Sequence, residues 1–236
     1  MSKEFVPIRV STLRGDQQID FNAYVKINEK FILYIKNGDS FEGDRLQRLK
    51  TKKLKKMFIE PDSESRYRSY MQKNIEMAYD KGSGKDITTR AEIIQGNQQA
   101  NAEAVMEDPG NEAAYRETKD AASKFVQFLE QEDQSLASIL NIANADQSIA
   151  HHGVTVSSLA VSLAKKIKMT DAKQLQLLSL GALLHDFEHF HSGITLNLPV
   201  EQMKDADLKI YKQHPLLGAQ KVQDKKHFDA SVLRVS

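Results

Sequence analysis

The sequence predicts a small α+β domain that is followed by an all-α helical domain. Alternating apolar residues, which are typical of strands, occur near the N-terminus, whereas helical spacing dominates from about residue 147 onward. The histidines also collect in this second region. We therefore expect a regulatory or docking domain over residues 1–80, connecting helices over 81–145 and a helical domain over 146–236.

Length and composition exclude several classes of protein. At roughly 150 residues per domain, 236 residues suffice for one large or two modest domains. With 40% hydrophobic and 28% charged residues, the chain is expected to fold rather than to be disordered or fibrous. It contains no cysteine, which excludes disulfide scaffolds, thiolate zinc sites and cysteine nucleophiles. Histidine and carboxylate side chains remain as the strong metal ligands.

Charge and hydropathy predict a cytoplasmic protein. The opening residues, MSKEFVPIRV, lack the apolar run of about 7–15 residues that a signal peptide needs. The longest nearly apolar stretch, residues 180–184, is far shorter than the roughly 20 residues that cross a bilayer. A net charge of +1 gives no global attraction to nucleic acid or membrane. Nothing in the sequence defines the oligomeric state.

The N-terminal elements are predicted from period-two patterns and turn residues. Residues 19–27 and 31–35 indicate antiparallel strands, and Asn37-Gly38 predicts a tight turn because both residues tolerate positive φ. Seven of the residues from 45 to 56 are Lys or Arg. We interpret them as a solvated helix face, with a phosphate-binding stripe for nucleic acid as the alternative. A helix near 62–81, whose tyrosines are expected to pack, completes the domain.

The rest of the chain is predicted to be helical. An acidic connecting stretch over 96–146 is interrupted at residues 108–111, and further helices are expected near 147–168, 171–186 and 205–223. On the helix near 147–168, His152 falls on an apolar stripe, so we expect it to point inward and His151 to be exposed. The other members of this stripe are Ile149, Val156, Leu159, Leu163 and Ile167.

His185 and Asp186 end the next predicted helix in an apolar setting. Burying an imidazole and a carboxylate costs several kcal/mol unless they are paired or bind a cation. Adjacent helical positions diverge by about 100°, so the two side chains can hold one metal from different sides, or Asp186 can bridge two. His214, beside Pro215 at an expected helix start, is a third candidate ligand. This set suits Fe, Mn, Zn, Co or Ni.

The order of these residues resembles the HD superfamily, specifically the HD-GYP group of bacterial cyclic di-GMP phosphodiesterases. Asp146 and His152 resemble the opening of the family pattern, residues 182–186 (ALLHD) its A-x-L-H-D helix end, and residues 214–218 (HPLLG) its H-P-x-x-G. Residues 1–80 also resemble the small domain that often precedes such modules. The resemblance implies that the metal ligands are His152, His185, Asp186 and His214.

The resemblance implies a signalling protein that binds cyclic di-GMP, with metal-dependent phosphodiesterase activity left open. Two divalent cations, with iron expected and manganese as the alternative, would acidify a bridging water and stabilise charge on a phosphoryl oxygen. Asp186 is the expected bridge. A protein partner is expected to dock on the N-terminal domain. The alternatives are a non-catalytic helical scaffold without metal and, less favoured, a nucleic-acid-binding role for residues 45–56.

The sequence departs from the family pattern in two places. The family continues H-D-x-G-K, whereas this chain has Glu188 and His189 at the positions of the Gly and Lys. His189 is therefore a candidate catalytic residue that gives a hydrogen bond or proton to the substrate, with an exposed loop residue as the alternative. Glu188 is a weaker candidate ligand, and His191 and His227 are expected on the surface. The sequence also stops before the H-H-E and G-Y-P motifs, so we expect it to be part of a longer polypeptide.

Overall fold

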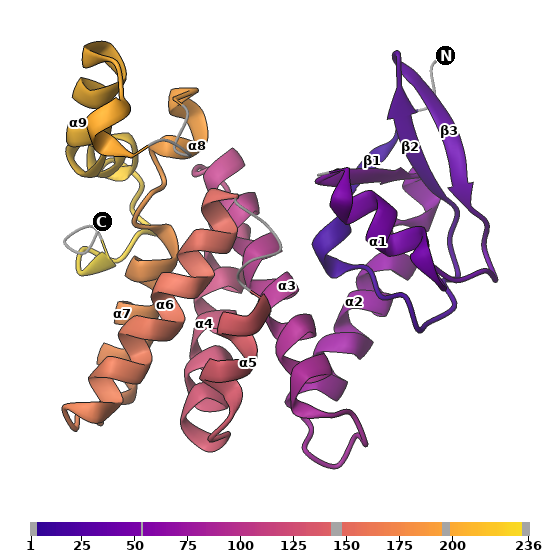
Figure 1. Ribbon diagram of the computed structural model, residues 1–236, viewed down its shortest axis with the longest axis horizontal. Helices are drawn as coiled ribbons and strands as arrows, with labels where there is room; N and C mark the ends of the chain where they lie inside the picture. Colours follow the sequence, from indigo (N-terminus) through magenta and orange to yellow (C-terminus); the bar gives the residue numbers. More distant parts are fainter. Residues whose placement is uncertain (1–3, 53, 143–147, 195–198, 233–236) are drawn as a thin grey trace. The chain divides into compact units, whose positions relative to one another are not determined.

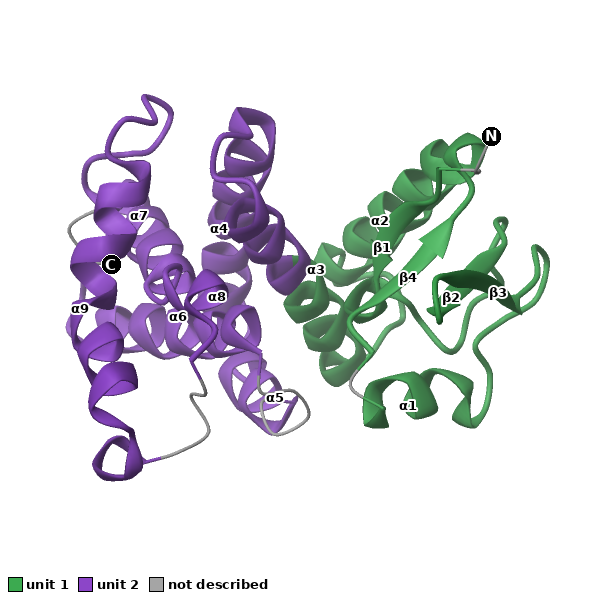
Figure 2. Ribbon diagram, turned by 90° about the horizontal axis from the view of Figure 1, so that it is seen from above, with its two compact units in different colours: residues 1–97 green, residues 98–236 purple. Residues whose placement is uncertain are grey.

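The computed structural model describes residues 4–52, 54–142, 148–194 and 199–232, and Figure 1 shows their arrangement. The chain forms two compact units, Met1–Asn97 and Gln98–Ser236, which Figure 2 distinguishes by colour. Their boundary falls inside helix α3 (Ile87–Glu107). A small antiparallel sheet domain is followed by a helical domain, which confirms the predicted fold class. The division at residues 80 and 145, and the docking role of residues 1–80, stay predictions.

The first unit is built on a four-stranded antiparallel sheet. Its strands are β1 (Val6–Arg9), β2 (Ala23–Ile27), β3 (Lys30–Ile35) and β4 (Lys56–Ile59), in the order β1-β4-β2-β3. Asn28 and Glu29 join β2 to β3 with positive φ angles of 46° and 62°. The strand predicted over 19–27 is shorter than expected and begins at Ala23, while Ile19 and Phe21 are buried in the segment that leads into it.

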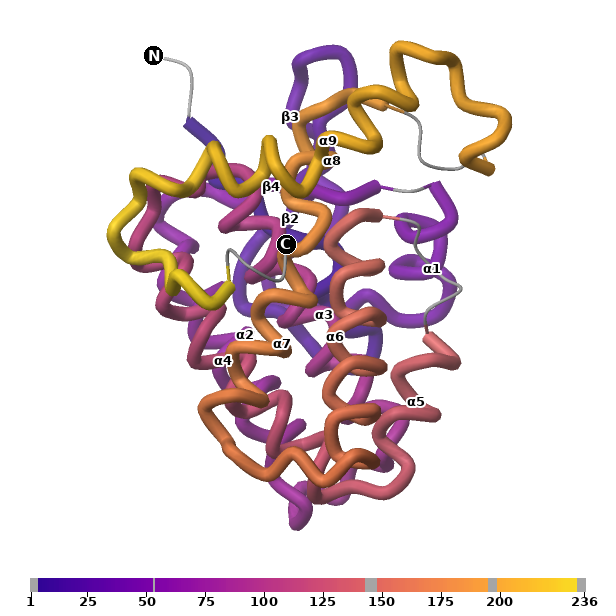
Figure 3. Tube along the Cα trace, turned by 90° about the vertical axis from the view of Figure 1, so that its left-hand side faces the viewer, coloured from indigo at the N-terminus to yellow at the C-terminus, as the bar shows by residue number. Residues whose placement is uncertain are grey.

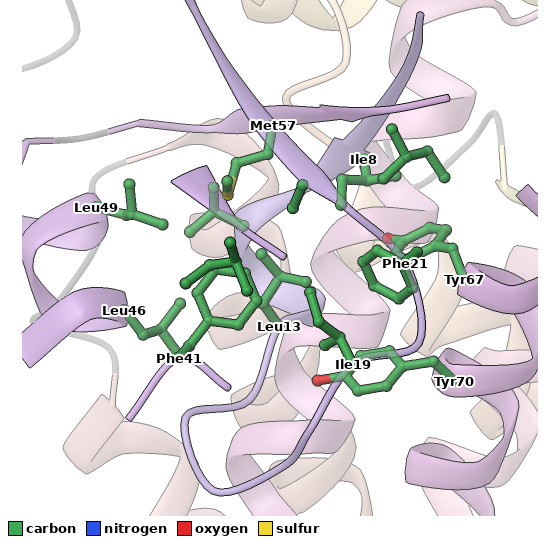
Figure 4. Packing of buried hydrophobic residues seen from close by; sticks show 14 residues of the cluster. Ile8, Leu13, Ile19, Phe21, Phe41, Leu46, Leu49, Met57, Tyr67 and Tyr70 are labelled. Atoms are coloured by element: carbon green, nitrogen blue, oxygen red, sulfur yellow. The ribbon is translucent and has the colours of Figure 1, made fainter. Parts of the chain in front are cut away.

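Helices α1 (Asp44–Thr51) and α2 (Glu64–Tyr79) contribute to the core of this unit (Figure 4). The ring of Phe21 makes T-shaped contacts with those of Tyr67 and Tyr70, at centroid distances of 5.7 and 5.8 Å. The hydroxyl of Tyr67 is 2.7 Å from that of Thr12, and the hydroxyl of Tyr70 accepts from the backbone N–H of Arg14. Burial raises the pKa of Tyr70 to about 12. The expected packing role of these tyrosines is confirmed.

The basic segment over residues 45–56 begins in α1 and extends to the start of β4. The exposed Arg45 and Arg48 form ion pairs with Asp39 and Asp44, at 2.7 and 3.7 Å. The buried face of α1 carries Leu46 and Leu49 instead. This arrangement fits the solvated-face interpretation, because the arginine charges are already paired with carboxylates of the same unit.

Gly96 allows the N-terminal part of α3 to lie close to the backbone of Ser11 within the first unit. We therefore expect Gly96→Ala to destabilise the protein. An added Cβ would lie 2.2 Å from the carbonyl oxygen of Ser11, which is shorter than the van der Waals radii of the two atoms allow. Although alanine favours helix by up to about 1 kcal/mol, overpacking against backbone should lower the free energy of unfolding by about 2–3 kcal/mol. Urea denaturation measures the change. Asn97→Ala is the control, and equal stability of the two variants would contradict the expectation.

The second unit contains the C-terminal part of α3 and the helices α4 (Glu112–Gln131), α5 (Ser135–Ile142), α6 (Ile149–Lys166), α7 (Ala172–Leu184), α8 (His189–Ser192) and α9 (Asp205–Val222). Helices α6 and α7 lie side by side, and α4 packs against both (Figures 1 and 3). Side chains of Asn111, Ser148 and Asp171 cap the N-termini of α4, α6 and α7. Short 3₁₀ turns occupy Val10–Thr12 and Pro61–Ser63 in the first unit and Val200–Gln202 in the second.

No described helix is both long enough and apolar enough to span a membrane.

Helix α6 buries a different face from the one that the sequence predicts. His151 is only 4% exposed, whereas the side chain of His152 is 55% exposed, so the predicted orientations of these two histidines were wrong. The reason is close packing of small residues. A Cβ on Gly153 would lie 2.2 Å from the carbonyl oxygen of Leu183 in α7, and the hydroxyls of Ser157 and Ser179 are 2.8 Å apart. The predicted apolar stripe is left exposed at Leu159, Leu163 and Ile167.

Helix α9 continues through Pro215, so His214 lies within the helix. The prediction that His214 stands at a helix start is therefore wrong. A proline inside a helix has no N–H to donate to the carbonyl four residues earlier, which here belongs to Tyr211. The imidazole of His214 uses that carbonyl instead, with its Nδ1 at 2.5 Å. The side-chain hydrogen bond thus replaces a backbone one, which makes the internal proline tolerable.

Candidate metal centre

Four side chains that the sequence singles out meet where α6, α7 and α9 approach one another. Asp186 follows the C-terminal end of α7 and lies at the centre. Its Oδ2 is 3.3 Å from Nε2 of His185 and 3.7 Å from Nε2 of His152, which stands in the first turn of α6. Its Oδ1 is 3.4 Å from Nε2 of His214 in α9. The predicted convergence of these residues is therefore present in the structure.

The two oxygens of the Asp186 carboxylate face different groups of imidazoles. His152, His185 and Asp186 offer ligand atoms that lie within 4.8 Å of one another, and so do Asp186, His189 and His214. Asp186 belongs to both groups. A carboxylate shared in this way can serve one ion through each oxygen.

Backbone carbonyls orient two of the imidazoles. Nδ1 of His185 lies 2.8 Å from the carbonyl oxygen of Ala182, and Nδ1 of His214 makes the equivalent contact with Tyr211. A carbonyl oxygen can only accept, so both Nδ1 atoms carry a proton, and in a neutral imidazole the remaining lone pair on Nε2 then faces Asp186. This is how proteins hold histidines that bind metals, because the outer hydrogen bond sets the tautomer and the ring orientation.

His189 starts the short helix α8 and is 3% exposed, so it is not an exposed loop residue. Its ring stacks on that of Tyr211 at 5.5 Å with an interplanar angle of 11°, and its centroid is 4.3 Å from that of His214. Burial lowers the pKa of His189, and the neighbouring His214 adds to this shift. The imidazole is thereby kept neutral, which is the form that binds metal.

Glu188 is committed to an ion pair, which argues against the ligand role considered for it. Its carboxylate is 2.7 Å from Nζ of Lys221 in α9. Sequence reasoning missed Lys221, although it follows His214 and Gly218 at the four-and-three spacing of one helix face. Gly218 lies against the backbone and Cβ of Glu188, so this face of α9 borders the site.

The remaining histidines lie outside both groups. Nε2 of His191 contacts the carbonyl oxygen of Met106, and Nε2 of His227 contacts that of Pro109. The side chain of His191 is exposed and that of His227 is half-buried. Asp146, which belongs to the family's opening pattern, lies outside the described residues.

The donors fit a transition metal. Among the described residues, the side chains within ion-pair distance of Asp186 are imidazoles, with no lysine or arginine. A carboxylate that is mostly shielded from water needs a positive partner, which a bound metal ion can supply. Imidazole and carboxylate together suit Fe, Mn, Zn, Co and Ni. A divalent cation would compensate the charge and use the free lone pairs.

Comparison with known proteins places this chain in a family. No family model and no curated protein matches the chain. Among solved structures, the chain is similar to Bd1817, an HDG"Y"P protein from Bdellovibrio bacteriovorus, with 60% sequence identity and a TM-score of 0.91. The match covers 98% of this chain and 75% of that one. Because identity is high over nearly the whole length, the likeness extends beyond the fold, and the chain belongs to the HD-GYP family.

Proposed function

We propose that the helical unit is a signalling module whose metal centre binds cyclic di-GMP and hydrolyses one of its phosphodiester bonds. The observation that carries this proposal is the Asp186 carboxylate, whose two oxygens face the Nε2 atoms of three histidines. Membership of the HD-GYP family supports cyclic di-GMP as the ligand. The proposed ligands are His152, His185, Asp186 and His214, and the proposed metal is iron, with manganese as the alternative.

The side chains of the site have different proposed roles. Divalent cations bound here would supply Lewis acidity and a water-derived nucleophile at neutral pH. Asp186 would provide the negative charge that holds them, and the carbonyls of Ala182 and Tyr211 would keep His185 and His214 in the required tautomer. Because Asp186, His185 and His214 are each less than a quarter exposed, little reorganisation is needed when a ligand arrives.

Reconstitution of the full chain tests the proposal. The protein is stripped with a chelator, loaded without oxygen with Fe²⁺ or Mn²⁺, and analysed for metal and for conversion of cyclic di-GMP into the linear dinucleotide. We expect about two ions per chain and slow linearisation, because two cations are what this hydrolytic chemistry uses. His227→Asn, outside the site, is the control.

Each failure has a separate meaning. Loss of all metal on desalting would contradict the metal centre and favour the non-catalytic scaffold. Metal-loaded protein that binds the dinucleotide without forming product would contradict hydrolysis and leave a receptor role. Absence of binding would remove cyclic di-GMP as the ligand.

A further inference from the structure

The imidazole of His189 is buried without a hydrogen bond. Neither Nδ1 nor Nε2 has a hydrogen-bond partner among the described residues, and both atoms are shielded from solvent. A neutral imidazole carries one N–H donor and one acceptor, so burial in this state leaves both unmet at a cost in free energy. His185 and His214, by contrast, each bond a backbone carbonyl. The position of His189 therefore calls for a ligand that satisfies a ring nitrogen.

Such a ligand would meet two further donors. Asp186, His189 and His214 place one ligand atom each within 4.8 Å of the others. The oxygen of Asp186 that faces His214 is Oδ1, whereas Oδ2 faces His152 and His185. The carboxylate thus lies between two sets of imidazoles, and His189 is grouped with His214.

The ring of His189 is held by the same residue that orients His214. Tyr211 stacks on His189, and its carbonyl oxygen accepts from Nδ1 of His214. The backbone N–H of His189 also donates to the carbonyl of Asp186 at 2.9 Å. One helix turn of α9 therefore positions both imidazoles beside a carboxylate, and donors fixed in this way are expected of a metal site.

We infer that His189 is a metal ligand, which together with Asp186 and His214 forms a second metal position beside that of His152, His185 and Asp186. This inference rests on the proposed metal centre and changes the role of His189. The sequence predicts a contact with the substrate phosphate, in place of the family's lysine. The buried ring, close to two other donors, is placed instead to bind a cation, so a metal-binding imidazole stands where the family has a charged side chain.

Metal counting on variants of the full chain tests the inference. His189→Phe keeps a ring that can stack on Tyr211 and removes both nitrogens, and His191→Phe is the matched control two residues away. Apoprotein is loaded with Mn²⁺, desalted and examined by elemental analysis and electron paramagnetic resonance. We expect about two ions with spin coupling in wild type and in His191→Phe. In His189→Phe we expect half as much metal, with the six-line spectrum of an isolated Mn²⁺.

Two comparisons make the result decisive. The apo form of His189→Phe should melt no lower than apo wild type, because the change removes unsatisfied buried nitrogens; this excludes unfolding as the cause of metal loss. If His189→Phe retains the metal content and coupled spectrum of wild type, the inference is overturned and the proposed metal centre stands. If wild type itself binds no Mn²⁺ or Fe²⁺, the proposed function fails and the inference with it.

Discussion

Gly153→Ala is expected to lower the free energy of unfolding by about 3 kcal/mol. The added Cβ would lie 2.2 Å from the carbonyl oxygen of Leu183 and 3.1 Å from its carbonyl carbon. Both are backbone atoms of α7, so no side-chain rotation relieves the overlap, and α6 and α7 must separate. The pair between Ser157 and Ser179, at 2.8 Å, would be stretched as well. Urea denaturation followed by circular dichroism measures the loss.

The same change should also weaken metal binding, because Gly153 adjoins His152 and Leu183 precedes His185 and Asp186 by two and three positions. Gly218→Ala is the matched control. Its Cβ would meet the nearest atom, Cβ of Glu188, at 3.7 Å, which is ordinary contact. Alanine favours helix over glycine by up to about 1 kcal/mol, so this variant should be as stable as wild type or more so. Similar stabilities for the two variants would show that the close approach of α6 and α7 is not as described.

Asp186→Asn is expected to remove metal binding and any phosphodiesterase activity. The amide has nearly the shape of the carboxylate but carries no charge, and it cannot present an anionic oxygen to both groups of imidazoles. Substitutions of residues that merely orient ligands reduce metal affinity by about 10–100-fold. Loss of the shared ligand should exceed that range. Titration of apoprotein with Mn²⁺, followed by elemental analysis after desalting, measures the effect.

Glu188→Gln is the control for this prediction, since the same change of charge is made two residues away. Glu188 pairs with Lys221 and belongs to neither group of potential ligands. The control should therefore keep its metal. Equal metal loss in both variants would mean that net charge near α7, and not coordination by Asp186, determines binding.

The fold class was predictable because the period-two and helical patterns occupy separate parts of the chain. The face that α6 buries was not predictable from these patterns. Apolar periodicity selects large side chains, and so it favoured the stripe through Leu159 and Leu163. The tight packing of α6 on α7 depends instead on small residues. Gly153 and Ser157 have little bulk, which allows close contact with the backbone of α7. Hydrophobic patterns carry no information on that choice.

The site was predictable in part for a similar reason. His185, Asp186 and His214 lie within recognisable motifs, and the structure brings them together. The burial of His189 could not be read from its neighbours, because it depends on Tyr211 from a helix more than twenty residues later. The proline signal was also misleading: Pro215 suggests a helix start, yet the free carbonyl it leaves is taken by an imidazole.

At Pro215, the stability of α9 and the orientation of the His214 imidazole favour different residues. A residue with an N–H at this position would restore the backbone bond to Tyr211 and strengthen the helix by up to about 3 kcal/mol on propensity alone. That N–H would then compete with Nδ1 of His214 for the same oxygen, and the ring would lose the contact that sets its tautomer. Selection for thermal stability and selection for a ready-made ligand thus favour different residues here. Variants of this chain evolved only for heat resistance would be expected to lose function at a position that is not itself a proposed ligand.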